Sequence, residues 1–116
     1  MLTLDWVKGD AGAAWHALET VDLSNVTARG IYIIWHEGNP GRVVRIGFGD
    51  VARRLEAHRN DRTILAYGAK GALHVTWAAA SDEARQGAVR HLADQWSPLV
   101  VDVFLDVPPI AVNSPW

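Results

Sequence analysis

The sequence contains no cysteine among its 116 residues, and this absence excludes several kinds of site. A disulfide scaffold, a zinc site built from thiolates and a cysteine nucleophile all need a residue that the chain lacks. The sequence also contains neither the glycine-rich P-loop that binds nucleotide phosphates nor the strand-turn-helix motif that positions a serine nucleophile. Its five histidines do not occur at the spacing of helical metal sites, which favours separate structural or surface roles.

Long hydrophobic runs are also missing, since none approaches the roughly 18 residues that a membrane-spanning helix needs. The segment Met1–Trp6 has no basic stretch followed by an apolar one, so no secretory signal is indicated. We therefore expect a soluble, cytoplasmic protein without a membrane partner. The length fits one domain, residues 1–116, and the hydrophobic content of 49% is that of a globular chain.

The chain has no basic excess, because 11 basic and 13 acidic side chains give a formal net charge of −2. This balance argues against tight non-specific binding along a nucleic-acid duplex. The charge is uneven, however, since residues 1–41 and 63–116 carry −3 and −2 while residues 42–62 carry +3. Six of the eleven basic residues lie in that segment, and all are arginine: Arg42, Arg45, Arg53, Arg54, Arg59 and Arg62. The guanidinium fork suits phosphate, so an anionic ligand is expected here; the alternative is a solvated helix face with ion pairs.

Three segments rich in β-branched and aromatic residues predict a short, three-stranded, mainly antiparallel sheet. Residues 30–35 and 42–47 flank a turn that contains glycine, asparagine and proline, so together they predict a β-hairpin. Residues 72–77 alternate between apolar and other side chains and predict the third strand. With helices between these strands, the fold class is α/β (α+β).

Helices are predicted where capping residues precede apolar residues at helical spacing. Asp10 is placed to cap a short helix in an N-terminal extension, residues 1–29, and Ser81 to cap a later helix that Pro98 ends. An extended tail, residues 99–116, alternates in its first part as an edge strand does.

Between the hairpin and the third strand, Asp50 is placed to cap a helix over residues 51–59. Arg54 and His58 lie four residues apart on this helix, so both project from one face. This pair, following the hairpin, is the most specific pattern in the sequence.

In order and spacing, the hairpin and the helix resemble the GIY-YIG nuclease superfamily. The resemblance rests on Gly30–Tyr32 in the first strand, on Arg45–Gly47 at the end of the second, and on Arg54 and His58 in the helix. It covers about residues 30–98, and the end of the chain is similar to the tails of small stand-alone bacterial members. The resemblance implies a GIY-YIG-like domain of one short sheet flanked by helices.

The resemblance also implies an endonuclease that cleaves nucleic-acid phosphodiester bonds with one divalent metal, usually Mg²⁺. Tyr32, Arg54 and His58 match the family's catalytic residues. Arg45, Arg53 and Arg54 are the candidate phosphate ligands, since arginine offers charge-assisted hydrogen bonds to phosphate oxygens. Asn113 is matched to a family asparagine as an additional candidate site residue.

Two positions depart from the family pattern. Arg45 replaces the second tyrosine, and an arginine stays protonated, so it cannot act as a base. Val89 falls where the metal-binding glutamate belongs, and no residue one helical turn away from it is a carboxylate. We therefore expect a degenerate site without a metal ligand, with weakened or altered catalysis.

Each candidate residue also has a purely structural interpretation. Tyr32 fits a buried strand aromatic, Arg54 a surface ion pair with Asp50, and His58 a hydrogen-bonded structural histidine. For the whole protein, the alternative is a non-catalytic module that uses the same fold to bind a protein partner or a small phosphate-bearing ligand. Nucleic-acid binding by an acidic chain is expected to be weak.

Tryptophan is abundant, with six residues in the chain. Four lie on apolar faces of predicted elements and are expected in the core: Trp15, Trp35, Trp77 and Trp96. Trp6 and Trp116 are expected either to pack down on the domain or to stack on a base or a partner.

Overall fold

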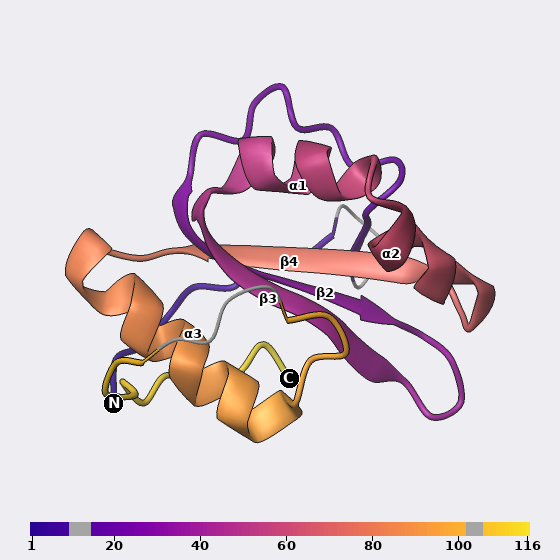
Figure 1. Ribbon diagram of the computed structural model, residues 1–116. Coiled ribbons are helices and arrows are strands. Elements are labelled where there is room, and N and C mark those ends of the chain that lie inside the picture. Colours follow the sequence, from indigo (N-terminus) through magenta and orange to yellow (C-terminus); the bar gives the residue numbers. More distant parts are fainter. Residues whose placement is uncertain (10–14, 102–105) are drawn as a thin grey trace.

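The computed structural model describes residues 1–9, 15–101 and 106–116. These residues form an α+β fold in which a four-stranded sheet lies between helix α1 on one face and helix α3 on the other (Figure 1). In chain order the elements are β1 (His16–Ala17), β2 (Arg29–His36), β3 (Arg42–Asp50), α1 (Val51–Arg59), α2 (Arg62–Leu65), the 3-10 helix η1 (Ala66–Ala69), β4 (Leu73–Ala79) and α3 (Asp82–Trp96).

The strands lie in the order β1-β4-β2-β3, and every neighbouring pair is antiparallel. The predicted hairpin is confirmed as β2 and β3, and the predicted third strand as β4. The predicted number of strands is wrong, because β1 adds a fourth strand at the edge of β4. Within the described residues, no helix is long and apolar enough to cross a membrane.

The N-terminal helix prediction is only partly open to comparison, because Asp10 and residues 11–14 lie outside the described residues. Where the chain is described again, His16 and Ala17 form a strand and the Leu18 amide donates to the Leu73 carbonyl at 3.0 Å. The prediction is wrong for this part. The exposed edge of β4 offers backbone groups that need partners, and this long-range pairing outweighs the local helical spacing.

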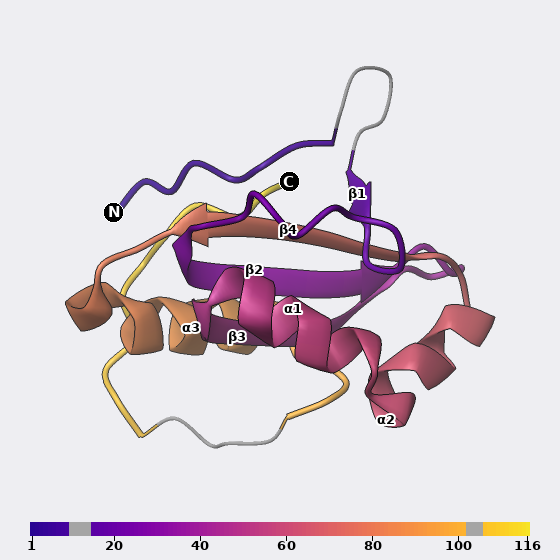
Figure 2. The same ribbon diagram turned by 90° about the horizontal axis from the view of Figure 1, so that it is seen from above.

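Residues 1–9 continue this cover of β4, and Figure 2 shows them beside that strand. The Val7 amide donates to the Trp77 carbonyl at 2.9 Å, and the Thr76 hydroxyl donates to the Val7 carbonyl at 2.7 Å. The edge of β4 that faces away from β2 is therefore paired by β1 and by Val7.

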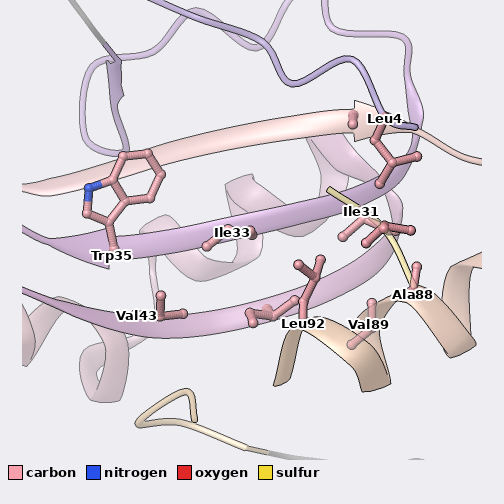
Figure 3. Close-up of a cluster of buried hydrophobic side chains, with 11 residues drawn as sticks. Leu4, Ile31, Ile33, Trp35, Val43, Ala88, Val89 and Leu92 are labelled. Atoms are coloured by element: carbon pink, nitrogen blue, oxygen red, sulfur yellow. The ribbon is translucent and has the colours of Figure 1, made fainter. Parts of the chain in front are cut away.

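Strand β2 lies in the middle of the sheet, and seven of its eight residues are buried because both of its faces are covered. One hydrophobic core fills the space toward α3, where the side chains in Figure 3 include Ile31, Ile33, Trp35, Ala88, Val89 and Leu92. A second core fills the space toward α1 and includes Tyr32, Ile34, Val51, Leu55, Val75 and Trp77. Alternation along β2 thus divides its side chains between the two layers.

The helix boundaries follow local chemistry. The Asp50 carboxylate accepts from the Arg53 amide at 3.3 Å and caps α1, as predicted. Ser81 occupies the N-cap position of α3, but its side chain makes no cap hydrogen bond. Ser97 ends α3 with a positive φ of 47°, directly before Pro98. The predicted end of this helix is confirmed.

The C-terminal tail runs beside the edge of β3 before it leaves the described part of the chain. The Leu99 amide donates to the Val43 carbonyl at 3.1 Å, and the Val100 amide donates to the Val44 carbonyl at 2.8 Å. Residues 102–105, where most of the predicted alternation falls, lie outside the described residues. The two described bonds close this edge of the sheet near Arg45.

The two ends of the chain are held together by Asn113. Its side chain accepts from the Leu4 amide at 2.6 Å and donates to the Leu4 carbonyl at 2.9 Å, as a neighbouring strand would. The Trp6 indole donates to the Asn113 carbonyl at 3.0 Å, and Leu2 forms a parallel bridge with Val112. Asn113 therefore joins segments that are more than a hundred residues apart in sequence.

The tryptophans are mostly in the core, as expected. Trp35 and Trp77 are buried, and Trp15 and Trp96 pack partly buried against the cores. Trp116 is 48% exposed, yet its ring meets those of Trp15, Trp35 and Trp96 edge-on, at centroid distances of 5.0 to 6.4 Å. Of the two alternatives for this residue, it packs on the domain.

We expect Asn113→Ala to lower the free energy of unfolding by about 1–3 kcal/mol, because it removes both bonds to the Leu4 backbone and leaves that backbone unpaired. Urea unfolding followed by tryptophan fluorescence measures the change. Ser114→Ala is the control, since its hydroxyl bonds only the exposed Trp116 carbonyl. Equal effects of the two changes would contradict the assigned role of Asn113.

Candidate functional site

A cavity of about 410 Å³ opens at the β3 edge of the sheet, between α1 and α3. Four elements contribute to its wall: Tyr32 from β2, Arg45–Phe48 from β3, Arg54 from α1 and Val89 from α3. Its volume is within the range of small-molecule sites. We call this cavity the β3-edge pocket.

The register of the hairpin decides which residues share a face. Tyr32 pairs with Gly47, and Ile34 pairs with Arg45, so these β3 residues lie on the α1 face of the sheet. One residue earlier the pairing shifts, because Val44 is inserted as a bulge between the partners of Ile34 and Trp35. The bulge brings both valines that precede Arg45 into the two cores and leaves Arg45 half-buried in the pocket.

Tyr32 is almost fully buried, and its hydroxyl lies 2.6 Å from Nε2 of His58. His58 is itself 8% exposed and lies on the inner face of α1. This arrangement agrees with the structural interpretation of both residues. Tyr32 lines the pocket and His58 does not, so the hydrogen bond joins a residue of the pocket wall to one outside it.

Gly47 makes this arrangement sterically possible. A Cβ atom at this position would lie 2.2 Å from the Tyr32 hydroxyl oxygen and 2.4 Å from Cζ. Any side chain here would therefore push the tyrosine ring away from His58. The glycine that ends the Arg45–Gly47 motif is needed for the hydrogen bond between the two catalytic candidates.

Arg54 is exposed at the start of α1 and lines the pocket. Arg54 does not form the alternative ion pair with Asp50. The Asp50 carboxylate caps the helix instead. In the described part of the chain, Arg54 makes no hydrogen bond or ion pair. Its side chain runs over Gly49, whose φ of 126° requires glycine and where an added Cβ would lie 3.4 Å from Nε of Arg54.

Two residues of α3 that the sequence reasoning did not single out also line the pocket. Arg90 and Asp94 form an ion pair, with Nε 3.2 Å from the carboxylate. Helical spacing from Val89 does not point to them, because Arg90 and Asp94 lie about 100° and about 140° around the helix from it. Phe48 is a third unpredicted member, and it contributes an aromatic ring to the wall.

The arginines of residues 42–62 have different roles in the structure. Arg53 is exposed on α1 and is not among the residues that line the pocket, because its position on the helix differs from that of Arg54 by about 100°. Arg59 donates to the carbonyls of Leu18 and Val21 at 3.0 and 2.7 Å, so it holds the loop before β2. Of the candidate phosphate ligands, only Arg45 and Arg54 meet in the pocket.

Asn113 does not join this site. Its side chain bonds to Leu4, and it lines a second cavity near the chain ends, apart from Tyr32 and Arg54. The structure therefore does not bring this candidate residue together with Tyr32 and Arg54. The tail alone gave no sign of its partner, because that partner is at the opposite end of the chain.

The charged groups of the pocket suit an anion better than a metal ion. Its described lining contains Arg45, Arg54 and Arg90 but a single carboxylate, Asp94, which is already paired with Arg90. Magnesium prefers oxygen ligands, usually carboxylates, whereas Val89 offers hydrocarbon where the family has glutamate. Within the described residues no three metal-binding side chains come together. The residues present therefore do not fit the Mg²⁺ that the family resemblance implies.

We expect Gly47→Ala to destabilise the protein by about 1–3 kcal/mol, because the new methyl group displaces the Tyr32 ring in a closely packed layer. Gly68→Ala is the matched control, since a Cβ there lies 3.8 Å from the Leu73 side chain, an ordinary contact. Thermal unfolding compares the two variants. A Gly47→Ala protein as stable as the control would refute the close approach of Gly47 and Tyr32.

The chain was compared with protein-family models, with curated proteins and with solved structures, and none of the three comparisons found a match.

Proposed function

We propose that this protein is a nucleic-acid-directed domain of the GIY-YIG type, which binds a phosphate of its substrate in the β3-edge pocket. The observation that carries the proposal is the meeting of Tyr32, Arg45 and Arg54, from three different elements, in one pocket. Tyr32 and Arg54 are positions at which the chain resembles the family, and Arg45 stands where the family has its second tyrosine.

The arginines supply the binding chemistry. Arg54 is exposed and makes no described hydrogen bond, so its guanidinium group is accessible to phosphate oxygens. Arg45 is half-buried on the neighbouring strand, where a lower local dielectric strengthens its attraction for an anion. The guanidinium group of Arg54 offers paired donors that match two oxygens of one phosphate.

Tyr32 and His58 supply a fixed polar group beside this phosphate. The 2.6 Å hydrogen bond sets the orientation of the Tyr32 hydroxyl. The side chain therefore loses little conformational entropy when a ligand binds. The hydroxyl carries one proton and two lone pairs, so it has hydrogen-bonding capacity beyond its contact with His58. It adds a polar contact for a phosphate oxygen or a bound water.

Catalysis by this pocket is expected to be weak. The position expected to hold the metal-binding glutamate is Val89, which is 5% exposed and packs in the core between α3 and the sheet. Arg45 stands where a second tyrosine would be and stays protonated. The proposed protein therefore keeps the phosphate-binding part of the site and lacks the metal-binding part.

The second candidate function is a non-catalytic module that binds a small phosphate-bearing ligand in the same pocket. Val89 favours it, because an apolar wall in place of a carboxylate serves binding but not metal-dependent cleavage. The overall charge of −2 also favours a small anion over a long polyanion.

Binding tests the proposal through two neighbouring arginines. We expect Arg54→Ala to weaken binding of labelled single-stranded DNA or RNA by at least tenfold at low salt, because a charged hydrogen bond is lost. Arg53→Ala removes the same charge one residue away, outside the pocket, and we expect less than a twofold change. Fluorescence anisotropy measures both variants. Equal losses would indicate non-specific attraction, and no binding of the wild-type protein even at low salt would overturn the proposal.

Cleavage assays test whether the absence of a metal-binding glutamate at position 89 limits catalysis. We expect wild-type protein to cleave supercoiled plasmid, single-stranded DNA or RNA little or not at all with Mg²⁺ or Mn²⁺, and Val89→Glu to gain metal-dependent cleavage. Val89→Gln is the control, because it has a similar size without the charge, and circular dichroism checks that both variants fold. Robust wild-type cleavage that Arg54→Ala abolishes would show that the assignment of a degenerate site is wrong.

A further inference from the structure

We propose that the β3-edge pocket takes one nucleotide, its phosphate and its base together, and does so without a divalent metal. The inference rests on the proposed function, because it names the ligand of the same pocket. The nucleotide is either free or the end of a single strand, since both present the same phosphate and base.

Alternation along β3 gives the pocket two chemically different walls. Arg45 and Gly47 lie on the α1 face, with Tyr32 and Arg54, and make that wall polar. Ile46 and Phe48 alternate with them and pack with the core against α3. The polar and apolar walls therefore meet along one strand.

The apolar wall has no use in binding phosphate alone. Phe48 is half-buried, and Val89 and Pro98 line the pocket near it. A phosphate ion would leave these side chains uncovered, whereas the flat face of a base covers such groups by stacking. A ligand that satisfies both walls has an anionic group at one end and a flat, largely apolar ring at the other.

Arg90 and Asp94 add polar groups next to the apolar wall. Their ion pair has 3.2 Å between Nε and the carboxylate. It presents hydrogen-bond donors and an acceptor from the C-terminal half of α3. The polar edge of a base offers the complementary pattern. These two residues thus fit a base whose ring lies against Phe48.

The size and the surrounding charge exclude a long duplex as the favoured ligand. A cavity of about 410 Å³ has the volume of a site for one small molecule. A duplex would require a basic surface that continues beyond the pocket, but the segments before and after residues 42–62 carry net charges of −3 and −2. One nucleotide uses the local arginines and avoids the acidic flanks.

Metal independence follows from the same charges. Arg54 offers its positive charge to a phosphate directly, and the described lining lacks the carboxylates that would hold a cation between protein and phosphate. Binding should therefore persist in the presence of EDTA.

Isothermal titration calorimetry in EDTA tests the inference with six probes: adenosine and cytidine 5′-monophosphates, the two nucleosides, inorganic phosphate, and a 5′-phosphorylated single-stranded pentanucleotide. We expect the better of the two monophosphates to bind at least tenfold tighter than its nucleoside and than inorganic phosphate, because only the nucleotide reaches both walls. A pentanucleotide that binds as tightly as this monophosphate identifies a strand end as an equal ligand, and one that binds more weakly identifies the free nucleotide.

Two variants test the contributions of the apolar and polar walls to binding separately. Phe48→Leu should weaken mononucleotide binding at least fivefold and leave phosphate binding unchanged, whereas Arg54→Ala should weaken both. Arg53→Ala is the matched control and should change neither. Thermal unfolding checks that Phe48→Leu stays folded, and Phe48→Tyr, which keeps the ring, should restore nucleotide binding.

The outcomes distinguish this inference from the proposed function. Nucleotide that binds no tighter than phosphate, or binding that requires Mg²⁺, would overturn the inference. Arg54-dependent binding of the pentanucleotide without measurable binding of either monophosphate would overturn it too, while the proposed function would stand. No binding of any probe would overturn both.

Discussion

The pairing of Tyr32 with Gly47 across β2 and β3 is the constraint on which the site depends. The glycine leaves room for the tyrosine ring, and the ring places its hydroxyl 2.6 Å from Nε2 of His58. Since His58 lies on the inner face of α1, this hydrogen bond fixes how the helix lies over the strands. One turn earlier on the same helix, Arg54 then lies over the end of β3 and at the pocket. The register of β2 and β3 thus determines where the guanidinium group of Arg54 lies.

The pocket combines this polar arrangement with the hydrophobic layer against α3. Because β3 is the outer strand beside α1 and α3, both faces of the strand contribute to one cavity. Arg45 comes from one face and Phe48 from the other. The net charge of the chain is −2, but the local charge of the described pocket lining is positive, because three arginines face a single carboxylate. Charge at the scale of the site, rather than of the whole chain, is what bears on the ligand.

The sequence predicted the parts of the structure that local chemistry determines. The hairpin, the Asp50 cap and the end of α3 before Pro98 follow from alternation, capping and proline geometry, and all three are confirmed. Strand β1 was missed because two residues carry no periodicity, and its existence depends on the open edge of β4. The bonds of Asn113 could not be predicted for a similar reason, since its partner Leu4 lies at the far end of the chain. The contribution of α3 to the pocket could not be predicted from the sequence, because it depends on β3 being the edge strand of the sheet.

Nuclear magnetic resonance of the arginine side chains tests the central claim most directly, namely that Arg54 binds phosphate in this pocket without a metal. Adenosine or cytidine 5′-monophosphate is titrated into the protein in EDTA while the Nε–Hε resonances are followed. We expect a saturable shift of the Arg54 resonance, with Arg53 and Arg62 unchanged, because those two exposed arginines lie outside the pocket. Small, equal shifts of all exposed arginines, or an Arg54 shift that appears only when Mg²⁺ is added, would contradict it.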